Sequence, residues 1–170
     1  FSGALGQTRP TNPPMRACVI FNPTARGNKA RHFRRHLDDF AGGVALKPTQ
    51  APGDGRRLAA EAVRDGFDTL VAAGGDGTVN EVLNGLADVP DGFARARLAV
   101  LPLGTVNVFA RELGLPLSLR PAWQAILNGG ERRIDVPFAE FTAPDGTRQR
   151  RYFAQLGGAV RLEPFRESLS

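Results

Sequence analysis

Residues 69–86 read Thr-Leu-Val-Ala-Ala-Gly-Gly-Asp-Gly-Thr-Val-Asn-Glu-Val-Leu-Asn-Gly-Leu. The first five residues form a short apolar run that predicts a β-strand, and the glycines within residues 74–77 predict a turn. Beyond the turn, apolar side chains recur at i, i+3, i+4 and i+7, at Val79, Val82, Leu83 and Leu86. That spacing is typical of one buried helix face. A strand, a turn and a helix in this order favour a parallel sheet covered by helices.

Patterns typical of strands and helices also alternate before and after this stretch. Further strands are predicted at residues 17–21, 44–47 and 98–101. One helix is predicted over residues 28–40, and a second has Leu58 and Val63 on its inner face and Gly66 as its left-handed cap. A third has Val106 and Phe109 on its inner face. A fourth begins near Pro121 and has Trp123 and Leu127 on its inner face. The predicted fold class is therefore α/β, an open, mostly parallel, Rossmann-like sheet with helices on both faces.

The pattern changes near residue 133. Residues 134–141 and 151–156 flank the turn Pro144-Asp145-Gly146 and predict a β-hairpin. We therefore expect three parts: a flexible leader over residues 1–16, an α/β lobe over residues 17–133, and the beginning of a truncated, β-rich second lobe over residues 134–170.

Composition limits the class of protein. The chain has 170 residues, 42% of them hydrophobic, and a net charge of +5, which suits an anionic partner such as a nucleotide, an acidic membrane surface or nucleic acid. Cys18 is its single cysteine, so an intrachain disulfide is excluded and a reducing compartment is favoured. No apolar run approaches the roughly 20 residues that span a bilayer. The expected location is the cytoplasm, with at most peripheral contact to a membrane.

Three strand-to-helix turns have unusual compositions. They are Asn22-Pro23-Thr24-Ala25-Arg26-Gly27, Gly74-Gly75-Asp76-Gly77-Thr78 and Pro102-Leu103-Gly104-Thr105-Val106-Asn107. In an open parallel sheet such turns lie outside the carboxyl ends of the strands, at one edge. We therefore expect the three turns to meet around one ligand.

The glycine turn favours a phosphate ligand. Glycines let a ligand approach the backbone, and the following helix N-terminus offers unpaired N–H groups to an anion. The turn lacks the lysine of a Walker loop and the last glycine of the dinucleotide fingerprint. Asp76 within it is open to three interpretations: a metal-linked carboxylate, an acceptor of a substrate proton, or a turn aspartate that accepts backbone N–H bonds.

Several of these residues also have purely structural interpretations. Thr78 and Glu81 have the spacing of a capping box, Thr105 that of a helix N-cap, and Asn22 that of a turn starter. Asn80 and Asn84 share one helix face, where they are either solvated or contact adenine or ribose. His32 and His36 are spaced i, i+4 among arginines, and we expect a surface pair rather than metal ligands. No metal-ligating residue is assigned.

Together, residues 22–25, 74–82 and 102–111 resemble the three signature blocks of the diacylglycerol kinase catalytic domain, which sphingosine kinases and bacterial lipid kinases share. The resemblance covers about residues 17–157. It implies an ATP-dependent, Mg²⁺-requiring kinase of phospholipid metabolism that phosphorylates a lipid hydroxyl at a membrane surface. It implies Asp76 as the catalytic residue. The implied nucleotide contacts are Asn22, Pro23, Thr24, Ala25, Arg26, Thr49, Gly74, Gly75, Asp76, Gly77, Thr78, Val79, Asn80, Glu81, Gly104, Thr105 and Asn107.

The sequence departs from the family pattern at two places. Arg26 stands where the first turn commonly has glycine, and Ala159 stands near a position where many members have an acidic residue. Two other functions therefore stay open: an NAD-kinase-like enzyme with a soluble acceptor, and a non-catalytic nucleotide-binding or regulatory module. ATP and a lipid are the expected partners and nucleic acid is not. A homo-oligomer formed through an unpaired hairpin edge is an alternative to a monomer.

Overall fold

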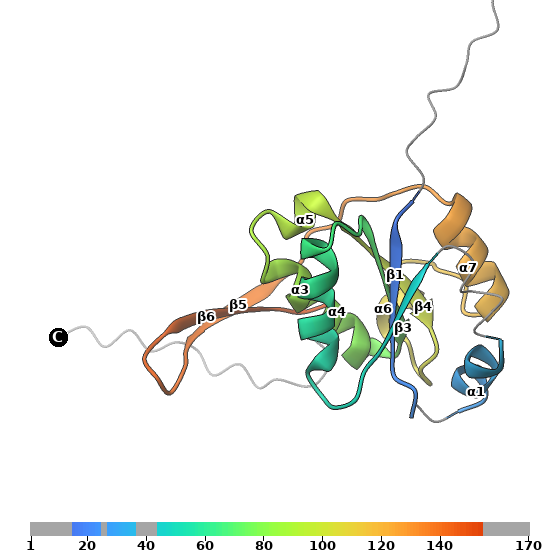
Figure 1. Cartoon of the computed structure of the whole chain (residues 1–170), viewed down its shortest axis with the longest axis horizontal. Coiled ribbons are helices and arrows are strands. Elements are labelled where there is room, and N and C mark those ends of the chain that lie inside the picture. The colour runs from blue at the N-terminus through green and yellow to red at the C-terminus, as the bar shows by residue number, and fades with distance from the viewer. Residues whose placement is uncertain (1–14, 25–26, 37–43, 155–170) are drawn as a thin grey trace, which may run out of the picture.

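The computed structural model describes residues 15–24, 27–36 and 44–154 (Figure 1). Its elements are, in chain order, β1 (Ala17–Phe21), α1 (Asn28–Arg35), β2 (Ala45–Pro48), α3 (Asp54–Arg64), β3 (Thr69–Gly74), α4 (Asp76–Ala87), α5 (Gly92–Arg95), β4 (Arg97–Pro102), α6 (Val108–Glu112), α7 (Leu119–Asn128), β5 (Phe138–Thr142) and β6 (Arg148–Tyr152).

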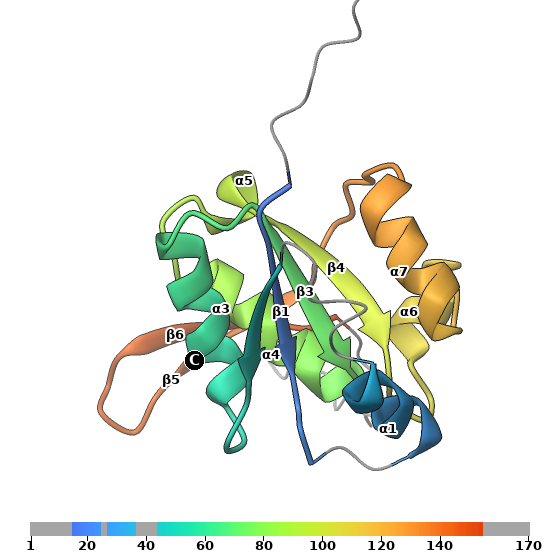
Figure 2. The ribbon, with the colours of Figure 1, turned by 45° about the vertical axis from the view of Figure 1, so that its right-hand side comes forward.

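Four strands form a parallel sheet in the order β2-β1-β3-β4 (Figure 2). Phe21 lies opposite Pro48 and Ala73, and Gly74 lies opposite Pro102, so the strands end level with one another. The chain leaves β1 toward β2 on one side and then crosses to β3 on the other side. In open α/β sheets ligands bind outside the strand carboxyl ends, where the direction of winding reverses. Here that place lies beside the ends of β1 and β3.

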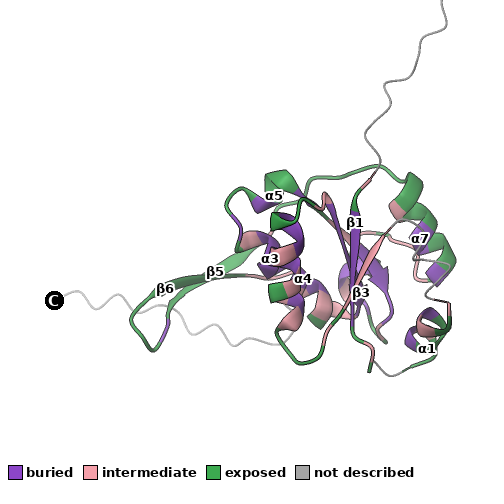
Figure 3. Cartoon of the chain, in the orientation of Figure 1, coloured by how far each residue is buried: buried purple, intermediate pink, exposed green. Residues whose placement is uncertain are grey.

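Helices cover both faces of this sheet, which confirms the predicted fold class. Successive strand residues point to opposite faces, so Cys18, Ile20 and Leu70 pack with α3 and α4. Val19 and Val71 pack with α1 and α7 on the other face. β1 and β3 are buried at every position (Figure 3). Such strands read as continuous apolar runs in the sequence, which is why residues 17–21 and 69–73 were recognisable.

The predicted hairpin forms a separate antiparallel sheet of β5 and β6, with Phe138 opposite Tyr152 and Gly146 in the turn at φ 81°. β5 begins four residues later and ends one residue later than predicted, and β6 begins three residues earlier than predicted. Residues 155 and 156 of the predicted second strand lie outside the described residues. In Figure 1 the hairpin projects from the body of the parallel sheet, and every residue of β5 is exposed. The predicted division of the chain into lobes stays a proposal.

Some predicted helix boundaries were wrong. α6 begins at Val108, and Val106, expected to face inward, is 58% exposed in the preceding loop. Leu127 is 44% exposed because α7 buries only a narrow stripe near Trp123. The short α5 was not predicted. α1 ends at Arg35, and the later part of the helix expected to reach residue 40 lies outside the described residues.

Other helix ends match the predictions. Gly66 has φ 82° directly after α3, and its N–H donates to the Val63 carbonyl oxygen at 3.1 Å, as expected of a left-handed cap. Of the predicted leader, Arg16 is described: its backbone N–H donates to Asp68, and its guanidinium lies over the Phe67 ring. Residues 1–14 lie outside the described part of the chain. Within that part, the helices are too short or too polar to cross a lipid bilayer.

Cys18 provides a test of the packed core. Its side chain has no exposed surface, and burial raises the pKa of its thiol from 9.0 to about 11. Because the thiolate is the reactive form, we expect a thiol reagent at pH 8 to label Cys18 no faster than the whole chain unfolds. Labelling followed against denaturant concentration checks this. Rapid labelling of the native protein would contradict the described packing of β1.

Candidate functional site

The carboxyl ends of the four parallel strands bring four chain segments to one edge. Asn22 follows β1, Thr49 follows β2, Gly75 follows β3 and Leu103 follows β4. The Thr49 N–H donates to the Phe21 carbonyl oxygen at 2.8 Å, which ties the first two segments together. The predicted meeting of the three turns at one sheet edge is therefore present.

The second and third turns are in direct backbone contact. The Gly74 carbonyl oxygen accepts hydrogen bonds from Leu103 N at 3.0 Å and from Gly104 N at 3.3 Å. A Cβ atom on Gly104 would lie 2.6 Å from the Gly75 Cα atom, well inside contact distance. Glycine at residue 104 is therefore required for the close approach of the two turns.

Asp76 joins these turns through its side chain. Its Oδ2 accepts the Val108 N–H and its Oδ1 accepts the Phe109 N–H, both at 3.1 Å. These are the first two residues of α6, whose N–H groups have no acceptor within that helix. The carboxylate therefore caps a helix that begins 32 residues later in the chain. The backbone-bonded interpretation of Asp76 holds, but its partners belong to the third turn, and each oxygen keeps lone pairs for another ligand.

Asn107, and not Thr105, occupies the N-cap position of α6. It has φ 51°, is buried, and donates from Nδ2 to the Gly104 carbonyl oxygen at 2.6 Å. Its Oδ1 is buried and has no hydrogen-bond partner among the described residues. Thr105 is exposed in the loop before α6, so its N-cap interpretation was wrong.

The first turn of α4 presents backbone donors at an open surface. The helix begins at Asp76, so Gly77 belongs to the helix and the predicted turn is shorter than residues 74–77. N–H groups in a first helical turn lack intrahelical acceptors, and a Cβ atom at Gly77 would meet nothing within 4 Å. The Thr78 hydroxyl packs back against Gly74, where an added Cβ would lie 2.2 Å from Oγ1. The surface of the first turn of α4 is therefore open at Gly77.

The predicted capping box of Thr78 and Glu81 was wrong. Glu81 points away from the start of its own helix: its Oε1 accepts Gly53 N at 2.9 Å and its Oε2 accepts Gly55 N at 2.8 Å. It thereby caps α3. Val79 is also turned from the edge, into the core. The side chains of Glu81 and Val79 thus have structural partners, although both residues were among the expected nucleotide contacts.

Asn80 and Asn84 both bond the chain at or just after the end of β6. Asn84 is 5% exposed and exchanges two hydrogen bonds with the backbone of Tyr152, and Asn80 Oδ1 accepts Ala154 N at 2.7 Å. The expected solvation is wrong for Asn84, because its partner, β6, is a strand more than 60 residues away in the chain. The nucleotide contact of Asn80 stays a prediction.

The first turn is held by its own side chains. Asn22 Oδ1 accepts the Thr24 N–H and the Thr24 hydroxyl, both at 2.8 Å, as expected of a turn starter. Ala25 and Arg26 lie outside the described residues. Next to Thr49, the backbone N–H groups of Gln50 and Ala51 donate to Asp54 and hold the pKa of that carboxyl below its usual value.

The histidine pair lies on α1. The His32 and His36 rings are in contact, tilted by 39° with centroids 4.2 Å apart, and His32 is exposed, as expected for a surface pair. In the described ranges, no three His, Cys, Asp or Glu side chains are grouped so that they could hold a metal ion.

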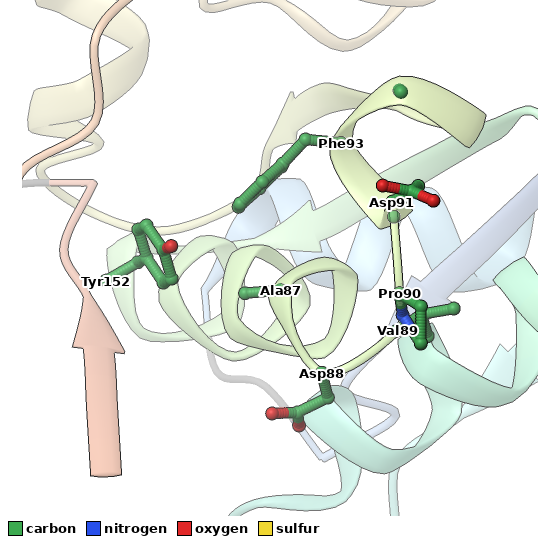
Figure 4. Close-up of a pocket in the computed structure, with 9 residues that line it drawn as sticks. Ala87, Asp88, Val89, Pro90, Asp91, Phe93 and Tyr152 are labelled. Atoms are coloured by element: carbon green, nitrogen blue, oxygen red, sulfur yellow. The ribbon is translucent and has the colours of Figure 1, made fainter. Parts of the chain in front are cut away.

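A cavity of about 590 Å³ lies elsewhere, at the carboxyl end of α4. Residues 87–94 and Tyr152 line it (Figure 4). The rings of Phe93 and Tyr152 meet there, with centroids 5.3 Å apart. Because the glycine turn lies at the other end of α4, this cavity is not part of the site at the strand ends.

The comparisons with known proteins agree with one another. Residues 16–139 match the family described as the diacylglycerol kinase catalytic domain. A diacylglycerol kinase of Staphylococcus saprophyticus is 37% identical in an alignment of length 154 that covers 86% of this chain and 46% of that protein. For one of Staphylococcus aureus strain MRSA252 the identity is 36%, over 86% of this chain and 44% of that protein. A crystal structure of a diacylglycerol kinase from Bacillus anthracis has a TM-score of 0.60 at 30% identity and covers 72% of this chain and 42% of that one. The chain thus spans less than half the length of these relatives.

Proposed function

The chain belongs to the diacylglycerol kinase catalytic domain family, and from this premise we propose that it binds ATP at the strand ends and serves transfer of the γ-phosphoryl group to a lipid hydroxyl. The observation that supports the proposal is the first turn of α4, where N–H groups without intrahelical acceptors lie beside Gly77, a residue at which an added Cβ atom would meet nothing within 4 Å. A triphosphate supplies the anion that such a helix start attracts.

The proposed reaction forms one bond and breaks one. The lipid hydroxyl oxygen attacks the γ-phosphorus, the bond from that phosphorus to the bridging oxygen breaks, and ADP leaves. The hydroxyl proton passes to a base. Positioning and charge neutralisation contribute most of the catalysis in such transfers. Asp76 is the carboxylate of the glycine turn, and its capping of α6 fixes the direction of its remaining lone pairs. We assign it to proton acceptance or to orientation of the phosphate-bound cation.

The residues present are compatible with Mg²⁺ that arrives with the nucleotide. Asp76 offers one carboxylate at the edge, and Mg²⁺ in nucleotide sites usually takes one or two carboxylates and completes its shell with phosphate oxygens and water. When bound, the ion neutralises charge on the phosphates. The Thr105 hydroxyl and the α4 N–H groups would orient the nucleotide.

Titration calorimetry with Mg²⁺ and ATP tests the binding step. We expect Gly77→Asp to weaken ATP binding about tenfold, which corresponds to about 1.4 kcal/mol, because the new carboxylate would stand beside the phosphates. Gly130→Asp is the matched control, since a Cβ atom there also meets nothing within 4 Å. Equal affinities of the two variants would contradict an ATP site at α4.

A transfer assay then separates the candidate functions. Radiolabelled ATP is offered with diacylglycerol in anionic lipid micelles, and separately with NAD. Labelled lipid supports the proposal, whereas labelled NADP identifies an NAD-kinase-like enzyme. ATP binding without transfer to either acceptor favours a nucleotide-binding module.

A further inference from the structure

The side-chain amide of Asn84 takes the place of a neighbouring strand along one edge of β6. Its Nδ2 donates to the Tyr152 carbonyl oxygen at 2.8 Å, and its Oδ1 accepts the Tyr152 N–H at 2.9 Å. Nδ2 also donates to the Asn80 carbonyl oxygen at 2.8 Å, within the same helix. A buried amide with three hydrogen bonds has a fixed orientation, so Asn84 fixes where Tyr152 lies against α4.

The hairpin itself leaves this edge of β6 unpaired. Tyr152 lies opposite Phe138, and the next residue, Phe153, donates its N–H back to Pro137 at 3.0 Å. Because the bonding direction alternates along an antiparallel pair, the Tyr152 N–H and carbonyl point away from β5. They point toward α4, as the Ala154 N–H also does.

Helix and strand spacings match at this contact. Asn80 and Asn84 are four residues apart, a rise of about 6 Å along a helix. Tyr152 and Ala154 are two residues apart, about 6.6 Å along a strand. Asn84 binds Tyr152 and Asn80 binds Ala154, so β6 runs antiparallel to α4 and approaches the helix end that carries the glycine turn.

Within residues 44–154, the other contacts of this region with the parallel-sheet body include the packing of Ala154 against the core. An isolated two-stranded hairpin is marginally stable in water. The described ring contacts between the hairpin and the parallel-sheet body include that of Tyr152 with Phe93. Without the hydrogen bonds between Asn84 and Tyr152, the side-chain amide of Asn84 and the backbone N–H and carbonyl of Tyr152 would need water molecules as hydrogen-bond partners. The hydrogen bonds of Asn80 and Asn84 therefore contribute to holding β6 and the residues after it against α4.

We propose that Asn80 and Asn84 form an amide clamp that couples ATP binding at the glycine turn to the placement of β6. The clamp closes only when Asn80 and Asn84 stand one helical turn apart, and this turn directly follows the N–H groups proposed to bind phosphate. ATP bound at the first turn of α4 favours the helical conformation of that turn. The bonds of Asn80 and Asn84 to Ala154 and Tyr152 need the next turn to be helical too. Both therefore stabilise the same conformation of α4. The inference rests on the proposed function for the identity of the nucleotide.

Amide hydrogen exchange measured by NMR tests the clamp. In Asn84→Ala we expect exchange at Tyr152 and Ala154 to accelerate at least about tenfold, while amides in β3 exchange as before. Asn128→Ala is the matched control, because Asn128 Nδ2 also donates to a residue four positions earlier, here the Gln124 side chain, but Asn128 is exposed at the end of α7. Unchanged exchange at Tyr152 in Asn84→Ala would overturn the proposal.

If ATP stabilises the bonded position of β6, that position must strengthen ATP binding by the same factor. Saturating ATP should slow exchange at Tyr152 in the wild type about fivefold or more, and the dissociation constant of ATP should rise by the same factor in Asn84→Ala. Ala154→Pro removes the donor to Asn80 from the strand side and leaves α4 unchanged, so it should weaken ATP binding in the same direction. If Asn84→Ala fails to fold, the dissociation constant of ATP for Ala154→Pro tests the coupling in its place.

The outcomes distinguish this inference from the proposed function. A wild type that does not bind ATP overturns the proposed function and the coupling with it. ATP binding that is equally tight in the wild type and both clamp variants, with no change in exchange at Tyr152, overturns the coupling alone.

Discussion

Replacing Gly85 with alanine should lower the free energy of unfolding by about 3 kcal/mol, at the upper end of the usual range for overpacked cores. Gly85 lies on α4 against α3, and a Cβ atom there would lie 2.2 Å from the Arg56 carbonyl oxygen and 2.6 Å from the Ala59 Cβ atom. The nearer atom belongs to backbone and cannot rotate away. The two helices must separate, which opens the core around Val63 and Val82.

The direction of this effect is diagnostic. In an exposed helix, glycine-to-alanine changes stabilise by up to about 1 kcal/mol. Gly77→Ala on the same helix is therefore the matched control, because its Cβ atom would meet nothing within 4 Å. Urea unfolding of both variants measures the two free energies. A Gly85→Ala protein as stable as Gly77→Ala would show that α3 and α4 are not in the described contact.

The buried elements were predictable because their signals are local. β1 and β3 appear in the sequence as uninterrupted apolar runs, and the buried face of α4 appears as a spacing of three and four residues. Gly85 illustrates the limit of such patterns. A glycine within a helical pattern is either tolerated or required, and only the position of α3 decides between these.

The helix caps could not be predicted from local motifs. Asp76 caps α6, and Glu81 caps α3, across 32 and 26 residues of chain. Motifs such as the capping box assume that a side chain serves its own helix. Where parallel strands bring several helix starts to one edge, a carboxylate can reach a neighbouring helix instead. Thr105 was misassigned for the same reason, since α6 already had its cap in Asp76.

The candidate site was predictable in position but not in detail. Parallel topology requires Asn22, Gly75 and Gly104 to lie at one sheet edge, once the strands are recognised. The partners of Asn80 and Asn84 depend on where the hairpin folds back, 68 residues from Asn84. No spacing within residues 76–87 carries that information. Polar residues on a predicted ligand-binding helix therefore divide into ligand contacts and structural contacts only after the fold is known.

Asp76→Asn should reduce phosphoryl transfer about 1,000-fold, within the range for loss of a positioned acid or base, if the proposed function holds. The amide keeps one acceptor for α6 but turns an NH₂ group toward Val108 N or Phe109 N. We therefore also expect the free energy of unfolding to fall by about 1–2 kcal/mol. The substitution thus affects both chemistry and fold, and the two effects need separate measurements.

Three measurements separate these effects. Turnover is measured where urea unfolding shows each variant fully folded, ATP affinity by calorimetry, and the α6 cap by amide exchange at Phe109. Asp88→Asn is the matched control: it makes the same chemical change just past the other end of α4, where it breaks the ion pair with Arg56 far from the strand ends. That control should keep wild-type turnover despite a comparable loss of hydrogen bonds. Turnover of Asp76→Asn within threefold of the control would remove Asp76 from the chemistry and leave it as the residue that joins α6 to the glycine turn.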